Sequence, residues 1–326
     1  MATMSPRTDL VEEIATLSGG CLRVVDLLTG WPAVAEIASP EGRQMVSLHV
    51  GNVGLTHRGR DAVERRYQNP TSLDPIKALP GTRPLLLGLW KEMAVPVLVA
   101  HDAQLRVGQG GTRVSLFVGL GALRAAATSG WGQHTSADGE RIVTFSAALF
   151  PVFAEMFLHE TTPPIGETQR VLQAAEVSLG DPASIERGRR ATNVLIRDVK
   201  FRRNVVGAYD GSCAMCGLAL GIVEGAHIHP ASAPGSSDEV TNGLALCPNH
   251  HAAFDRHMVW VEPGSLRILL HPELVAAVAG STAAKAFVEA TLPSLRLPRS
   301  TAACPSDSSL TARYAFFDDA YAWVDP

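Results

Sequence analysis

Two pairs of metal-binding side chains lie close together in the C-terminal half of the chain. Cys213 and Cys216 form a Cys-x-x-Cys pair, and Cys247 with His250 repeats that spacing about thirty residues later. Three thiolates and one imidazole at these spacings suit a closed tetrahedral zinc site that holds two short knuckles together. We therefore predict that these four side chains bind one structural Zn²⁺.

Three further residues in the same stretch are not needed as zinc ligands. His227 and Asn242 lie between the two pairs, and His251 follows the second pair directly. Adjacent histidines cannot point the same way, so His250, the second member of its pair, faces the zinc and His251 faces a cleft. A neutral imidazole can take a proton from water near pH 7, and phosphodiester hydrolysis also needs a cation at the phosphate. The sequence thus predicts a hydrolytic site beside the zinc.

Three segments of this stretch, YDGSCAMCG, AHIHP and NGLALCPNHH, have the order and separations of one protein family. From about Lys200 to Pro272 the chain resembles HNH endonucleases of the ββα-metal type, in the variant whose zinc pairs bracket the active site. The resemblance implies that His227 is the general base and that Asn242 braces the loop carrying it. It also implies that His251 binds a catalytic divalent metal, Mg²⁺ or a similar ion, and that the substrate is double-stranded DNA.

The chain departs from that family at one position of the site. Many members carry an acidic metal ligand immediately before the general base, whereas this chain has Ala226. Glu224 is one candidate replacement, and Asp255, four residues after His251, would share a helix face with that histidine. His229 could share a strand face with the general base, have a loop or phosphate-contact role, or be an ordinary exposed histidine. The second protein ligand of the catalytic metal stays open.

A structural zinc knuckle without activity is the competing interpretation of this cluster. Four ligands satisfy zinc without His227, Asn242 or His251, so the presence of these three residues favours the nuclease. Disulfides are disfavoured, because the chain has only five cysteines and two of them, Cys21 and Cys304, lie far from the cluster. Such a set suits a reducing compartment.

Basic residues gather directly before the zinc ligands. The formal net charge of −4 does not by itself suit a DNA-binding protein, so their placement matters more than their number. We predict that this cluster grips phosphates on the approach to the active site. Its members are Arg187, Arg189, Arg190, Arg197, Lys200, Arg202 and Arg203, opposed only by Asp198. The competing interpretation is a solvated helix face beside an interdomain linker.

The first half of the chain predicts a mixed domain in which strands predominate. Apolar runs such as PLLLGLW and PVLVA indicate buried strands, and alternating patterns indicate half-buried ones. We expect helices over Asp9–Leu17, Ala122–Ala127 and Phe150–Leu158. We expect further strands over Leu22–Leu28, Ala33–Ala38, Gln44–Val50, Arg113–Val118 and Arg141–Phe145.

This domain carries arginines and aromatic residues but no recognisable catalytic motif. The segment GQGGTR lacks the Lys-Ser/Thr ending of a nucleotide-binding loop, so no nucleotide cofactor is expected. HRGR, ERRYQNP, Trp90, Arg113 and Trp131 could contact phosphates or stack on bases, although the two tryptophans are more typical of a core. A reader of DNA sequence or modification followed by an HNH nuclease resembles the plan of bacterial restriction endonucleases.

We therefore expect an α+β chain in four parts. Residues 1–160 would recognise DNA or its modification, and residues 161–199 would form a linker with a basic helical connector. Residues 200–275 would be the HNH nuclease with its structural zinc, including a hairpin of Met258–Val261 and Leu266–Leu270. Residues 276–326 would dock the C-terminus through an aromatic segment.

The function that these patterns favour is a restriction or phage-defence endonuclease acting on modified DNA. A conventional sequence-specific restriction enzyme and a catalytically inactive, zinc-dependent DNA-binding module stay open. The apolar runs are too short to span a bilayer, and acidic residues near the N-terminus do not suit a signal peptide, so we expect a cytoplasmic protein. One site of this kind cuts one strand, which leaves a homodimer open.

Overall fold

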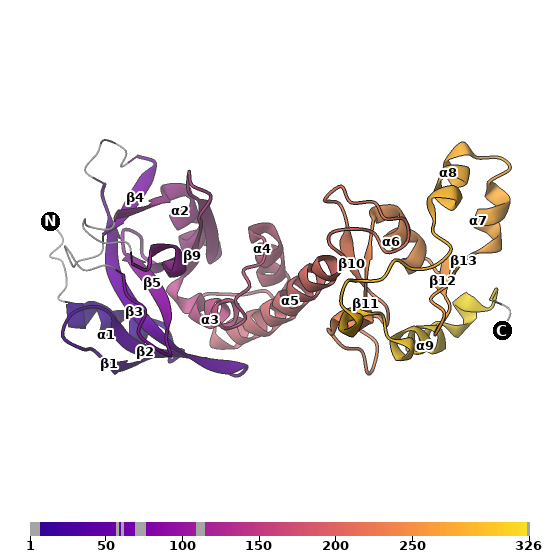
Figure 1. The fold of residues 1–326 in the computed structure, drawn as a ribbon. Helices are drawn as coiled ribbons and strands as arrows, with labels where there is room; N and C mark the ends of the chain where they lie inside the picture. Colours follow the sequence, from indigo (N-terminus) through magenta and orange to yellow (C-terminus); the bar gives the residue numbers. More distant parts are fainter. Residues whose placement is uncertain (1–6, 57–58, 60–61, 69–75, 109–114, 325–326) are drawn as a thin grey trace. The chain divides into compact units, whose positions relative to one another are not determined.

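The computed structural model of the chain describes residues 7–56, 59, 62–68, 76–108 and 115–324 (Figure 1). The chain divides into two compact units, Met1–Ile196 and Arg197–Pro326, each with its own hydrophobic core. The fold class is α+β, as predicted, with the strands concentrated in the N-terminal unit. No helix in the described ranges is both long and apolar enough to cross a bilayer.

A nine-stranded sheet dominates the N-terminal unit. Along its main path the strands follow the order β1 (Leu22–Asp26), β2 (Ala33–Ser39), β3 (Gly42–Gly54), β5 (Arg83–Trp90), β6 (Val97–His101), β9 (Arg141–Ser146) and β8 (Trp131–Thr135). Only β3 and β5 are parallel among these neighbours. A branch leaves this path, because β4 (Glu64–Gln68) pairs with the end of β3 and with β7 (Ser115–Gly119).

The central strands of this sheet are buried on both faces. In β5, Leu85, Leu87 and Leu89 belong to one core, whereas Leu86 and Trp90 belong to the other. This is why its sequence is a continuous apolar run rather than an alternating one. The helices α1 (Arg7–Leu17) and α3 (Phe150–Leu158) contribute to the first core, and α2 (Leu120–Ser129) contributes to the second.

The expected elements of this unit are present, with two additions. The three helices and the strands predicted from apolar runs and alternation lie within a few residues of their expected bounds. The strands β4 and β8 were not predicted. In β4 charged residues conceal the pattern, because Arg65 is buried and pairs with Glu92 at 2.7 Å.

Of the residues proposed to contact DNA from this unit, some are buried and others lie outside the described part of the chain. Trp90 and Trp131 are each 1% exposed, so both are core residues, as their type suggested. Arg113, and most of the HRGR and GQGGTR segments, lie outside the described residues. The Asn-Pro ending of ERRYQNP also lies outside them.

Two further helices follow the sheet. The helix α4 (Ile165–Ala174) supplies Leu172 to the first core of the N-terminal unit. The 27-residue helix α5 (Pro182–Ala208) contains the boundary between the units, with Ile196 in the N-terminal core and Phe201 in the C-terminal one.

A small hairpin and a helix form the centre of the C-terminal unit. The strands β10 (Glu224–His227) and β11 (Gly243–Leu246) are antiparallel, and α6 (Pro248–Asp255) follows β11 directly. The predicted second hairpin is also present as β12 (Val259–Val261) and β13 (Ile268–Leu270). It is followed by α7 (Pro272–Ala277), α8 (Thr282–Ala290) and α9 (Asp307–Phe316).

The C-terminal segment packs on this hairpin and helix through one buried arginine. Arg313 in α9 is 2% exposed, and its guanidinium donates to the carbonyl oxygens of Ile228 and Phe254 at 2.9 and 2.7 Å. It also donates to the hydroxyl of Tyr321 at 2.8 Å. Since buried charges need hydrogen-bond partners, these contacts fix the C-terminal segment against α6 and against the residue that follows β10.

Candidate active site

Two glycines allow α5 to lie directly against the β10–β11 hairpin. A β-carbon at Gly225 would lie 2.8 Å from the α-carbon of Arg202, and one at Gly243 would lie 2.3 Å from a methyl group of Val205. Neither space could hold a side chain. The close approach brings Phe201 under the end of β10, where the first candidate catalytic residue lies.

His227 is the last residue of β10 and is held on two sides. Its ring stacks on Phe201 with the ring centroids 3.7 Å apart and an interplanar angle of 14°. Its Nε2 lies 3.2 Å from Oδ1 of Asp238, and its side chain is 14% exposed. A hydrogen bond donated from Nε2 to this carboxylate leaves Nδ1 as the nitrogen that can accept a proton.

Asn242 is 1% exposed and ties together the loop that follows His227. Its Oδ1 accepts from the backbone N–H of His229 at 2.8 Å. Its Nδ2 donates to the carbonyl oxygens of His229 and Ser237 at 3.0 and 2.9 Å. The side chain therefore acts as a brace between the two ends of the loop and does not itself line the cleft.

Two of the sequence interpretations of His229 are wrong, and the structure places it in a loop. It is 7% exposed, so the interpretation as an ordinary exposed histidine is wrong. The strand β10 ends at His227, so the two histidines do not share a strand face. The Nε2 of His229 lies 3.1 Å from the carbonyl oxygen of Pro234, and its ring meets the edge of Phe316. These contacts make it a packing residue of the loop.

A pocket of about 340 Å³ brings the other candidate residues together with His227. His251, on α6, lies with Nδ1 3.0 Å from Oε2 of Glu224 and with Nε2 3.4 Å from Oδ2 of Asp255. All four residues line the pocket, and Ala226, which also lines it, offers no donor atom. Both acidic residues that the sequence offered as second ligands are thus beside the predicted metal ligand.

These donors suit a divalent cation. Two carboxylates and an imidazole are ligands that Mg²⁺, Mn²⁺ and similar ions accept. The side chains of Glu224 and Asp255 are 59% and 60% exposed, and the side chain of His251 is 26% exposed. A cation bound there would keep coordination positions for water and for a phosphate oxygen.

The four predicted zinc ligands form a compact cluster beside this pocket. Their ligand atoms all lie within 4.8 Å of one another, with Sγ of Cys247 3.2 Å from Nδ1 of His250 and 3.9 Å from Sγ of Cys216. Tetrahedral zinc with bonds of about 2.0–2.3 Å holds its ligand atoms roughly 3.3–3.8 Å apart. The cluster therefore fits a zinc ion.

Contacts around the cluster prepare it for a cation. His250 turns Nδ1 to the sulfurs and Nε2 to the hydroxyl of Thr291 at 3.0 Å, which orients the ring as metal-bound histidines require. Burial raises the pKa of the Cys213 thiol, but hydrogen bonds from His250 and from nearby backbone groups outweigh burial and lower that pKa to about 6. Thr291 was not predicted, because it lies about forty residues away in the chain.

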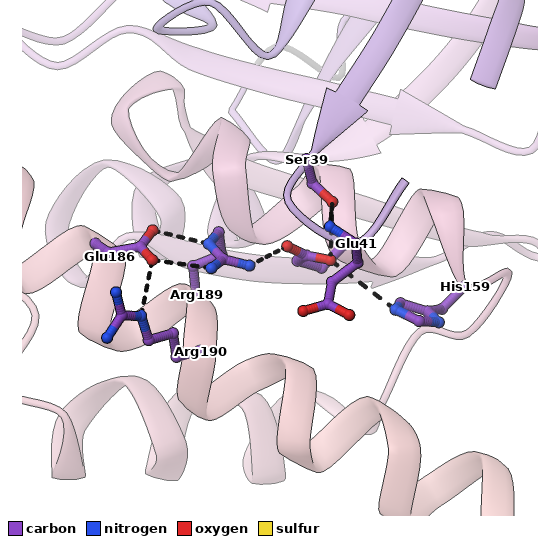
Figure 2. Close-up of polar contacts among 7 residues, drawn as sticks. Ser39, Glu41, His159, Glu186, Arg189 and Arg190 are labelled. Atoms are coloured by element: carbon purple, nitrogen blue, oxygen red, sulfur yellow. Dashed lines mark hydrogen bonds and ion pairs between the residues drawn. The ribbon is translucent and has the colours of Figure 1, made fainter. Parts of the chain in front are cut away.

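The basic cluster is not uniform. Arg189 is 6% exposed and lies in a buried network of the N-terminal unit (Figure 2). Its guanidinium pairs with Glu155, which is fully buried, and donates to both carboxylate oxygens of Glu186 at 2.8 and 2.9 Å. Arg189 is thus the counter-ion of a buried carboxylate, and its prediction as a DNA contact is wrong.

The other basic side chains of α5 are exposed. Two of them form ion pairs along the helix: Arg190 donates to Glu186 at 2.9 Å, and Arg202 donates to Asp198 at 3.1 Å (Figure 2 shows the first pair). Such exposed pairs contribute little stability and leave the cations accessible. The exposed members are Arg187, Arg190, Arg197, Lys200, Arg202 and Arg203.

Comparison with protein families identifies the C-terminal unit. Residues 213–262, which include the cysteine cluster and the residues of the pocket from Glu224 to Asp255, match the family model described as HNH endonuclease. The chain carries an HNH endonuclease domain. This confirms the predicted family and enzyme class, and with the cysteine cluster it confirms the predicted fold class.

Other comparisons concern the rest of the chain. Residues 44–154 match a family model described as Methylase-associated X1, which accompanies the HNH domain here. A solved structure titled "Modification dependent TagI restriction endonuclease" is 14% identical, with a TM-score of 0.31, and the match covers 94% of this chain and 89% of that one. No curated protein matches the chain.

Proposed function

We propose that the chain is a divalent-metal-dependent endonuclease that hydrolyses double-stranded DNA. The observation that supports this most strongly is the meeting of His227, Glu224, His251 and Asp255 in one pocket of the HNH domain. The four side chains supply a proton acceptor and a set of metal donors within one volume of about 340 Å³. Hydrolysis of a phosphodiester needs both.

In this proposal each residue of the pocket has one task. His227 takes the proton of the attacking water at Nδ1, while Asp238 holds the opposite nitrogen and Phe201 fixes the plane of the ring. Asn242 keeps the loop after His227 in place. A bound divalent cation would neutralise charge at the phosphate and the leaving oxygen. His251, Glu224 and Asp255 would hold it, with Glu224 supplying the donor that Ala226 lacks.

We propose that the zinc cluster is structural and that the exposed cations of α5 contact DNA. The cluster uses four protein ligands, which closes a tetrahedral site and leaves no position for substrate. Six exposed Arg and Lys side chains on one helix would release counterions when they bind phosphates, so DNA affinity should fall with salt. Arg189 has no part in this contact.

We further propose that the region before residue 160 selects the DNA and that modified DNA is its substrate. The match of residues 44–154 to a family named for its association with methylases supports this assignment. Residues 161–199 would connect reading to cutting, residues 200–275 would cut, and residues 276–326 would dock the C-terminus. Since one such site cuts one strand, a double-strand break would take a homodimer or two successive events. Unpaired cysteines suit a cytoplasmic protein.

A metal titration with plasmid DNA tests the proposal. Cleavage by the full chain should stop when EDTA removes free divalent ions and return with added Mg²⁺. The His251→Ala variant should cut at least about 100-fold more slowly, and Glu224→Gln should need about tenfold more Mg²⁺. Glu273→Gln, an exposed carboxylate on α7, is the matched control and should behave as the parent. Cleavage that is indifferent to EDTA would refute the metal-dependent mechanism.

A further inference from the structure

The N-terminal unit contains a second and larger pocket. Its volume is about 660 Å³, which lies within the range of about 300–1,000 Å³ typical of small-molecule sites. It lies between the β4–β7 branch of the sheet and the β6–β9–β8 end of the main path, since both contribute lining residues. Among the described residues, β7 pairs only with β4, so the two arms of the sheet stay separate at this pocket.

Three of the charged or titratable side chains that line this pocket, Glu140, Arg106 and His101, lie close together and form a polar wall. Glu140 is 5% exposed, pairs with Arg106, and accepts from the backbone N–H of Asp102 at 3.2 Å. His101 is 4% exposed, and its Nδ1 lies 3.6 Å from Glu140. Both ring nitrogens of His101 are buried, and neither has a hydrogen-bond partner within 3.5 Å in the described part of the chain. A buried nitrogen without a partner is costly unless a ligand or water completes it.

The protonation states of this wall are set by its neighbours. Burial would raise the pKa of Glu140, but contacts with His101 and Arg106 lower that pKa to about 2. Burial lowers the pKa of His101, against the opposing effect of Glu140. Near pH 7 the wall therefore presents a carboxylate and a neutral imidazole. Nδ1 is the ring nitrogen of His101 nearer to Glu140, and the tautomer that carries its proton on Nδ1 leaves Nε2 as a hydrogen-bond acceptor.

This chemistry favours one kind of ligand. Glu64, Asp138 and Glu140 bring three carboxylates to the pocket, and its arginine, Arg106, is already paired with Glu140, so a phosphate would be repelled. The acceptors instead match a neutral group with N–H donors, as a carboxylate accepts from the amino group of cytosine. Phe117, Leu116 and Ile142 supply apolar walls for a flat ring.

We propose that this pocket receives an amino-bearing nucleobase, cytosine or adenine or a modified form of either, turned out of the DNA duplex. The inference rests on the proposed function, because it assumes that the N-terminal unit reads the DNA that the HNH domain cuts. Proteins that inspect a base outside the stack hold it by hydrogen bonds to its pairing edge between apolar side chains. A site of this volume has space for a base together with a substituent.

Binding to matched duplexes tests the pocket. The probes share one sequence and carry, at one position, cytosine, 5-methylcytosine, 5-hydroxymethylcytosine, its glucosylated form or N6-methyladenine, with 2-aminopurine as the adjacent base. Affinity and 2-aminopurine fluorescence are measured for the full chain without added Mg²⁺. At least one modified duplex should bind more tightly than the unmodified one and raise the fluorescence, because a flipped base unstacks its neighbour.

Two variants address the pocket in different ways. Glu140→Gln removes the buried acceptor charge, and Ala137→Trp places a ring at the exposed rim without touching the buried contacts. Both should reduce the preference for the modified duplex by about tenfold or more and abolish the fluorescence rise. Glu12→Gln, which changes an exposed carboxylate on α1, is the control and should keep the preference for the modified duplex and the fluorescence rise. Because Ala137 is exposed, Ala137→Trp should fold even if Glu140→Gln does not, so the test does not depend on the Glu140 variant alone.

The outcomes separate this inference from the proposed function. If the parent shows no preference or fluorescence rise, or if Ala137→Trp retains both in full, the pocket is not a base-binding site, whether or not the chain cuts DNA. If the parent cuts no duplex with Mg²⁺ present, the proposed nuclease function fails first. Loss of preference with cleavage of unmodified DNA retained is the result that supports the inference.

Discussion

His227 and His251 line the same pocket, but their neighbours prepare them for different chemistry. His227 stacks on Phe201 and has one nitrogen beside the carboxylate of Asp238, which leaves the other nitrogen to accept a proton. His251 has a carboxylate beside each of its nitrogens, an arrangement that suits a cation. The proposed division of labour between base and metal ligand therefore rests on the immediate surroundings of each ring.

Asp238 is predicted to position the general base. In Asp238→Asn the amide still fills the space, but the charged acceptor that fixes the tautomer of His227 is lost. We expect cleavage to fall by about tenfold, with DNA affinity and unfolding temperature unchanged. Glu239→Gln, the exposed neighbour, is the control. Equal rates for Asp238→Asn and the parent would show that this contact does not matter for catalysis.

The sequence indicated the types of the site residues but not all of their partners. Cysteine and histidine spacing was sufficient to predict the compact cluster that could hold zinc, because the two members of each pair are close in the chain. Phe201, Asp238 and Thr291 carry no such signal, since each meets its histidine only after the hairpin, α5 and α8 have packed. Burial also separated Arg189 from its exposed neighbours, which the charge pattern alone could not do.

At the scale of elements, the close contact between α5 and the β10–β11 hairpin positions the active site. Gly225 and Gly243 face the helix where no side chain would fit, and their absence of a β-carbon brings Phe201 to His227. The hairpin and α6 carry the remaining pocket residues. The geometry of the pocket thus depends on a helix that lies entirely outside the HNH family match.

Gly243→Ala should damage both stability and cleavage. The new methyl group would lie 2.3 Å from Val205 and must push α5 away, which we expect to cost about 1–3 kcal/mol. The matched control is Gly207→Ala, where nothing lies within 4 Å of the added carbon and the helical backbone favours alanine. Urea unfolding and cleavage rates measure the effect. A Gly243→Ala chain as stable and active as the parent would contradict the packing argument.

The zinc cluster should be required for folding of the C-terminal unit. Cys216→Ser removes one ligand of the group that connects the loop before β10 to α6, so this unit should lose zinc and unfold. Cys304→Ser, outside the cluster, should keep one zinc per chain. Elemental analysis and circular dichroism provide the measurement. A folded, soluble parent without zinc would refute the structural role.

At the scale of the whole molecule, the chain divides into two units between Ile196 and Arg197. Residues 161–196, expected as part of a connector, pack into the N-terminal unit through Leu172 and Ile196. The Pro-rich break near residue 162 is a turn between packed helices, and α5 continues from one unit into the other. Composition marks such a break but does not reveal on which core the following helices lie.

Reading and cutting are predicted to separate when the chain is shortened. A fragment of residues 184–326 retains the zinc ligands, the pocket and all of the cations of α5, so it should nick DNA weakly and with little preference. The full chain should prefer one class of modified duplex. The test compares the cleavage rates of the fragment and of the full chain on matched DNA substrates. These are unmodified, methylated, hydroxymethylated and phosphorothioated. If both proteins rank the substrates in the same order, the N-terminal unit does not select the DNA.

The central claim is that the HNH pocket cuts DNA with His227 as its base. The most direct measurement is the rate of plasmid cleavage by full-length His227→Ala in Mg²⁺, beside the parent and the His271→Ala control. We predict a rate at least about 100-fold lower for His227→Ala, with unchanged DNA binding and unfolding, and a parental rate for the control. Cleavage by His227→Ala at the parental rate would contradict the account.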